Sequence, residues 1–364
     1  MSFSFGVACF NFGYVQQVPY SFTAEDYRSA VEELLSSLPS VTDIVVDVGG
    51  LARSPLVTEE PVNMREGEGL PYYGDARILF SVYIPRRVQE ELANRVGIQR
   101  RVAAENFRVD IRTEYHGPVA FVECVGGGHE EDPSMSVFLV REYLKKHLEG
   151  KDGVARFDYM GPSPFHAEFY LNHGAPTADS SFKLTYTPLK GYDNYLFEVD
   201  RQTIDDSDLF NLYDEMAGEL SLYYFLVRRR RDLLRSATKY EHRWAEVRKS
   251  VDSARFSNVL GAAARHRDVR SLISDGYALQ AEIAVVISEM KLMVAREYEN
   301  GTPSYFERSV RKVVEQFPEF SVDPILRWAE HVDGASYKKL EIMAVIAASV
   351  IGGLIGALIT SAIK

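Results

Sequence analysis

The chain has 364 residues, a net charge of −11 and 26% charged residues, so it is a mildly acidic protein with room for about two domains. That overall charge argues against general nucleic-acid binding. Its two cysteines, Cys9 and Cys124, form no CxxC pair and no disulfide pattern, which fits a reducing compartment and argues against a structural zinc site.

Residues 1–200 alternate short apolar runs with glycine and proline turns, which is typical of an α+β domain. We expect a mixed sheet with two or three helices on one face. The first strand has no basic leader before it, so no signal peptide is predicted. A polar, glycine-rich stretch at 53–75 is expected to be a mobile loop. The expected strands lie near 7–18 and at 43–50, 76–84, 107–115, 118–125, 165–171, 182–187 and 194–200.

Two helices in this first domain begin with clear capping signals. Thr23 and Asp26 form a capping box, so a helix is expected to start directly after the threonine. Asp132 is placed as the N-cap of another helix, with Pro133 as its first residue. A further short helix is expected around 87–96.

After residue 200 the apolar residues follow a helical period, and no proline occurs between Pro188 and Pro303. We therefore expect an all-α helical domain at 201–336. A break is allowed near 274–276, and the apolar stripe from Leu279 to Val294 is expected to form a helix-bundle core. The expected helices lie at 208–251, 258–298, 304–317 and 324–331.

Positive charge is concentrated in residues 226–270, which hold thirteen Lys or Arg against five acidic residues. This net +8 leaves −19 for the remainder of the chain. A guanidinium donates two parallel hydrogen bonds to a phosphate, and His242 and Trp244 are suited to stack on a base. Pairing with the acidic first domain and contact with acidic lipid headgroups stay open as alternatives. The predicted ligand-binding residues are Arg228, Arg229, Arg230, Arg231, Arg235 and Arg243.

The sequence contains no recognised catalytic motif. The glycine loop at 125–133 lacks the Lys and Ser/Thr of a P-loop, and its acidic residues would repel phosphate. His166, Glu168 and His173 lie close together in sequence, but their spacing matches no zinc signature. We therefore expect no enzyme, no cofactor and no metal. An enzymatic alternative would depend on His166 and Glu168.

The segment from Ile342 to Ile363 contains no charged residue over twenty-two positions. At about 1.5 Å per residue it reaches roughly 33 Å, enough to cross a bilayer core of about 30 Å. We therefore expect a single C-terminal transmembrane helix within a juxtamembrane and membrane region at 337–364. Lys338, Lys339 and the basic helices precede it, so the positive-inside rule predicts a tail-anchored protein of the inner (cell) membrane with a cytoplasmic body.

Small residues recur at four-residue spacing along this span, from Ala344 to Thr360 on one face. Transmembrane helices associate where small residues allow their backbones to approach, so the span is expected to meet copies of itself. One helix cannot enclose water, and a pore would need about four or more copies. The predicted pore or packing residues are Ser349, Gly352, Gly353, Gly356, Thr360 and Ser361.

The terminal span, its small-residue stripe and the arginine-rich helices together resemble the transmembrane effectors of bacterial antiphage systems, such as CBASS, CRISPR-linked and Hailong effectors. The resemblance implies a homo-oligomeric, ligand-gated pore or ion channel in the lipid bilayer. It also implies that a cytoplasmic domain senses a nucleotide or short oligonucleotide, which a partner enzyme would produce.

Two alternatives belong to other functional classes. The layout from about Asp206 onward also resembles the CorA magnesium channels, which implies divalent cation transport, although the Gly-Met-Asn signature of CorA is missing from this sequence. A tail-anchored scaffold or adaptor would hold its first domain at the membrane and recruit a partner without conducting ions.

Overall fold

The structure is a computed structural model that describes residues 2–14, 23–49, 76–97, 104–126, 132–151, 155–161, 163–174, 182–189, 192–200, 204–253, 259–299, 304–318, 320–335, 345 and 349. These residues form two compact units. Unit 1 comprises the described residues of Met1–Arg228 and Tyr298–Val313, and unit 2 comprises those of Arg229–Glu297 and from Val314 onward. The loop expected at 53–75 lies outside the described residues.

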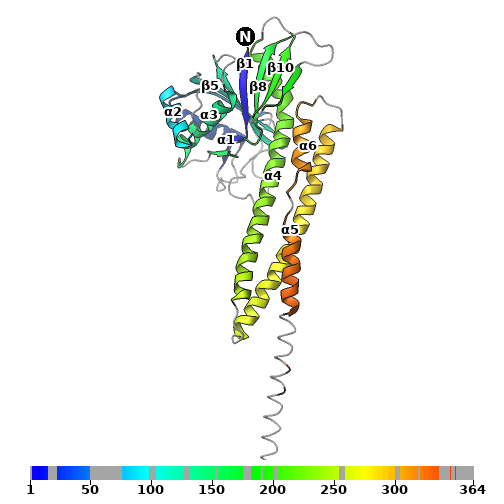
Figure 1. Cartoon of the computed structure of the whole chain (residues 1–364). Coiled ribbons are helices and arrows are strands. Elements are labelled where there is room, and N and C mark those ends of the chain that lie inside the picture. Colours follow the sequence, from blue (N-terminus) through cyan, green and yellow to red (C-terminus); the bar gives the residue numbers. More distant parts are fainter. Residues whose placement is uncertain are drawn as a thin grey trace, which may run out of the picture. The chain divides into compact units, whose positions relative to one another are not determined.

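Unit 1 is built on an eight-stranded mixed sheet (Figure 1). The strands in the described residues are β1 (Phe3–Ala8), β2 (Phe10–Tyr14), β3 (Val41–Asp47), β4 (Ala76–Tyr83), β5 (Asn106–Glu114), β6 (Gly117–Val125), β7 (Ala155–Tyr159), β8 (Ala167–His173), β9 (Lys183–Thr187) and β10 (Asp193–Val199). The large sheet has the order β3-β4-β5-β6-β1-β8-β10-β9. Its neighbouring strands are antiparallel except β8 and β10, which are parallel. Strands β2 and β7 pair antiparallel as a separate sheet.

Three helices share one hydrophobic core with one face of the large sheet: α1 (Ala24–Ser36), α2 (Arg86–Arg95) and α3 (Pro133–Leu148). The expected α+β architecture with a mixed sheet is confirmed. Both capping predictions are also confirmed. Thr23 and Asp26 exchange backbone and side-chain hydrogen bonds at the start of α1, and Asp132 Oδ1 accepts the amide of Met135 at 2.9 Å at the start of α3.

The opposite face of the sheet is covered by the first turns of α4 (Asp206–Asp252). The ring of Tyr213 stacks on Phe121 with centroids 4.1 Å apart and contacts Phe5 edge-on at 4.9 Å. Because successive side chains of a strand point to opposite faces, a strand that is covered on both sides is buried along its whole length. Strand β1 is buried in this way at every position.

The start of the chain differs from the strand expected near 7–18. The strand begins at Phe3 and is interrupted at Cys9, after which β2 joins β7 in the second sheet. The apolar alternation runs through Cys9 without a turn residue, so the sequence carries no local sign of the interruption. Strand β7 was not predicted, since its five residues are stabilised by pairing with the distant β2.

Unit 2 is a helix bundle, as the apolar stripe on its second helix predicted. It contains the second half of α4, most of α5 (Val259–Tyr298) and a helix at 322–335. Its core joins Tyr240, Leu272 and Leu326 from the three helices, and Trp244 meets Trp328 edge-on at 6.2 Å. Helix α6 (Glu307–Glu315) is shorter than the expected 304–317, and its residues up to Val313 belong to unit 1.

Helix α5 continues through the break that the sequence allowed at 274–276. A Cβ atom on Gly276 would fall well inside van der Waals contact with Tyr240 Oη and with the side chain of Leu326. Glycine at this position therefore permits the three helices of unit 2 to approach closely, and it does not end the helix.

Replacing Gly276 with alanine is expected to destabilise unit 2. The added methyl group overpacks the bundle at a cost of about 1–3 kcal/mol, which outweighs the helix propensity of alanine, worth about 1 kcal/mol. Both tryptophans of the chain lie in unit 2, so tryptophan fluorescence during urea unfolding of the full-length protein measures the change in its free energy of unfolding. Gly334→Ala is the matched control: no atom lies within 4 Å of its added Cβ, and this change should be stabilising. Equal effects of the two substitutions would contradict the packing argument.

Within the described residues, no helix has the length and apolar character needed to cross a membrane. The predicted span at 342–363 lies outside them, apart from Val345 and Ser349, which are both helical. Ser349 Oγ donates a hydrogen bond to the carbonyl oxygen of Val345 at 2.8 Å. The other predicted pore or packing residues lie outside the described residues: Gly352, Gly353, Gly356, Thr360 and Ser361.

Candidate functional site

The four consecutive arginines of α4 are divided between the two units. Arg228 belongs to unit 1, where its Nη2 donates to the sulfur of Cys9 at 3.4 Å. Arg229 belongs to unit 2 and pairs with Glu289 of α5 at 3.9 Å. Arg230 is partly exposed. The four side chains therefore do not form one cluster, since successive residues of a helix point in different directions.

Arg243 is held inside unit 2. Its guanidinium pairs with Asp275 of α5 and donates to Ser271 Oγ at 2.8 Å. These contacts join two helices of the bundle and favour a structural role for this residue. The sequence left open a pairing with the acidic first domain, whereas the partners of Arg243 lie in its own unit.

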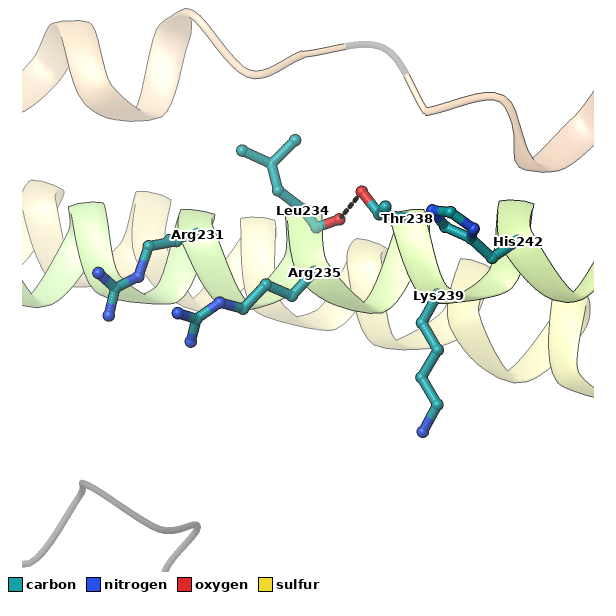
Figure 2. Close-up of a pocket in the computed structure, with 6 residues that line it drawn as sticks. All are labelled: Arg231, Leu234, Arg235, Thr238, Lys239 and His242. Atoms are coloured by element: carbon teal, nitrogen blue, oxygen red, sulfur yellow. Dashed lines mark hydrogen bonds between the residues drawn. The ribbon is translucent and has the colours of Figure 1, made fainter.

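Six residues of α4 line an open hollow of about 480 Å³ in unit 2 (Figure 2). We call this surface the basic face. Its members recur at steps of three or four positions, which places them along one side of the helix. They are Arg231, Leu234, Arg235, Thr238, Lys239 and His242.

The basic face has two different edges. Figure 2 shows the long side chains of Arg231, Arg235 and Lys239 extending toward one edge, whereas Leu234, Thr238 and His242 lie along the other. Thr238 Oγ1 donates to the carbonyl oxygen of Leu234 at 2.9 Å, so its proton is used within the helix. One edge thus offers positive charge, and the other offers apolar and aromatic surface.

The acidic side chain of Asp232 partly offsets this charge. Asp232 lies 3.5 Å from Arg235, whose side chain is 67% exposed. The carboxylate of Asp232 is 18% exposed, but the exposed guanidinium of Arg235 can reach a further anion from solvent. The basic face therefore retains the charge and the hydrogen-bond donors needed to bind a phosphate group.

The two aromatic residues that the sequence proposed for base stacking lie in different surroundings. His242 belongs to the basic face. Trp244 packs in the core of unit 2 against Trp328, and the guanidinium of Arg248 lies 5.4 Å from its ring centroid. Only the histidine is therefore placed to stack on a ligand at the basic face.

The residues considered for metal binding lie at or near β8 of unit 1. Glu168 accepts hydrogen bonds from the hydroxyls of Tyr170 at 3.2 Å and Ser134 at 3.4 Å. Burial raises the pKa of Glu168, and the nearby carboxylate of Asp132 raises it further. His166 is exposed, and the centroid of its ring lies 5.3 Å from that of Tyr192. The part of the chain that the structure describes contains no cluster of three metal-ligating side chains.

The sequence prediction included Arg231, Arg235 and His242 but omitted Leu234, Thr238 and Lys239. The four-residue spacing of the cations could have pointed to Lys239. Comparisons with protein family models, curated proteins and solved structures gave no match to this chain. The function proposed below therefore rests on the sequence and on the geometry of the basic face.

Proposed function

We propose that this protein is a homo-oligomeric membrane effector of the antiphage-defence type. In this proposal the basic face of α4 binds a phosphorylated ligand made by a partner enzyme. The span at 342–363 forms a ligand-gated pore in the inner membrane, and the body of the protein lies in the cytoplasm.

The observation that carries the proposal is the basic face itself. Arg231, Arg235 and Lys239 stand side by side along an open hollow, while Arg243 is engaged with Asp275. These three cations line a space that a ligand can enter. A guanidinium or ammonium group that contacts phosphate forms a charge-assisted hydrogen bond, the strong class of such bonds.

The pore half of the proposal is supported by the sequence of the span. Its uncharged length suits a bilayer, and its small residues suit close helix packing. Ser349, Thr360 and Ser361 would supply hydroxyl groups to the water-filled side of an assembly of about four or more copies.

Ion flux through liposomes tests this function. The ion flux carried by full-length protein should change when nucleotides or short oligonucleotides are added. The double substitution Arg235→Gln with Lys239→Gln should weaken ligand binding by about tenfold for each lost charge contact. Replacing 342–363 with an unrelated leucine-rich span should abolish flux and leave ligand binding intact.

Three outcomes separate the proposal from its alternatives. Absence of flux from inserted protein under every condition would favour the anchored scaffold. Flux of Mg²⁺ that is independent of nucleotides would favour a CorA-like transporter. Ligand binding that is unchanged after removal of Arg235 and Lys239 would refute the role of the basic face.

A further inference from the structure

We propose that the ligand of the basic face is a linear, single-stranded oligonucleotide, with its phosphates on the cationic edge and its bases on the opposite edge. This inference rests on the proposed function, and it specifies the chemical class of the phosphorylated ligand.

The first argument is the spacing of the positive charges. Arg231, Arg235 and Lys239 follow one another at intervals of four residues, which corresponds to about 6 Å along the helix axis for each step. Successive phosphates of an extended strand are separated by a similar distance, so each cation can face one phosphate. A regular row of charges suits a repeating anion better than a single compact one.

The second argument is the length of the row. From Arg231 to Lys239 the helix rises about 12 Å, so the outer two side chains begin far apart. A single phosphate or lipid headgroup would contact only part of the row. A chain of several phosphates can engage all three cations at once and gain binding energy at each.

The third argument is the opposite edge, which an anion alone would leave unused. Leu234 is a 38% exposed apolar side chain, and His242 is an exposed imidazole two turns further along α4. Apolar and aromatic side chains bind the faces of bases, and this stacking does not depend on the identity of the base. A strand that lies in the hollow with its phosphates on the cations would turn its bases toward these residues.

Fluorescence anisotropy on full-length protein in detergent tests the inference with a labelled single-stranded hexanucleotide, as RNA and as DNA. The unlabelled competitors are ATP, a trinucleotide, a hexanucleotide and inorganic triphosphate. We expect the hexanucleotide to compete at least tenfold better than ATP or triphosphate. Lys239→Gln should weaken hexanucleotide binding about tenfold and reduce the slope of log affinity against log salt by about 0.7.

The base edge has its own variant. His242→Ala should weaken hexanucleotide binding about fivefold or more and leave triphosphate binding unchanged, because triphosphate has no base to stack. Lys291→Gln, which removes an exposed cation of α5 outside the hollow, is the matched control and should change neither.

The outcomes distinguish this inference from the proposed function. If triphosphate or ATP binds as tightly as the hexanucleotide and His242→Ala alters none of them, the oligonucleotide inference is wrong while phosphate binding stands. If none of these anions binds, both are wrong.

Discussion

Asp110→Ala is expected to lower the stability of unit 1 by about 3–5 kcal/mol, the usual result of removing one partner from a buried ion pair. Asp110 lies in β5 and is 1% exposed. Its carboxylate accepts hydrogen bonds from Arg77 Nε at 3.0 Å, Arg77 Nη2 at 2.6 Å and Arg112 Nη2 at 3.2 Å. Without it, the guanidinium of Arg112, whose side chain is 5% exposed, loses its buried charged partner.

Asp214→Ala provides the matched control. Asp214 pairs with the same Arg112, but its side chain is 71% exposed, so its loss should cost about 1 kcal/mol or less. Amide hydrogen exchange of β4 and β5 in full-length protein measures both variants. The tryptophan fluorescence of unit 2 serves as an internal reference that neither substitution should change. Similar acceleration in the two variants would show that burial does not decide the effect.

The elements that were predicted well are those whose signals lie within a few residues. The hydrogen bonds that begin α1 and α3 join residues three positions apart, so the sequence around Thr23 and Asp132 contains all their participants. The long helices of the second half followed for the same reason, since their apolar period is continuous. Gly276 was the exception, because the need for a small residue arises from Tyr240 and Leu326, which are distant in sequence.

The contacts that were missed join residues from distant parts of the fold. Arg108 and Arg112 alternate with apolar residues in β5, which is the ordinary pattern of a strand with one exposed face. That face is instead covered by α4, so Arg108 binds Glu123 at 2.6 Å and Asp206 at 2.7 Å. The basic face was predicted in part for a similar reason. The density of arginines was visible, but Arg243 differs from Arg231 and Arg235 through its contacts with Asp275 and Ser271, which are distant in sequence.

Glu219→Ala is expected to release the start of α6 from α4, with a local loss of about 3 kcal/mol. Glu219 is 7% exposed, and its carboxylate accepts four hydrogen bonds within unit 1. They come from Tyr298 Oη at 2.8 Å, Ser304 Oγ at 2.8 Å, the amide of Tyr305 at 2.7 Å and the amide of Phe306 at 3.1 Å. The two amides directly precede α6, where a negative charge is favoured by the helix dipole.

The consequence of this contact reaches beyond α6. Residues 298–313 belong to unit 1, while the helices before and after them contribute to unit 2. Glu219 therefore fixes the segment through which α5 and the helix at 322–335 are connected. In the proposed effector, releasing this segment should weaken the response of ion flux to ligand. Ligand binding should be unchanged, because the residues of the basic face take no part in the contact between Glu219 and the start of α6.

A graded series of substitutions separates the charge of Glu219 from its shape. In Glu219→Gln the amide oxygen can still accept from the two backbone amides, and its NH2 group can donate to the hydroxyls of Tyr298 and Ser304 if they reorient. Hydrogen exchange of the α6 amides should thus accelerate about a hundredfold in the alanine variant, since about 3 kcal/mol corresponds to two factors of ten at about 1.4 kcal/mol each. In the glutamine variant the acceleration should be about tenfold or less. Glu215→Gln, which affects an exposed hydrogen bond from the Tyr305 hydroxyl, should have little effect. If the glutamine variant matched alanine, the negative charge would be the essential feature; if neither accelerated exchange, Glu219 would not hold α6.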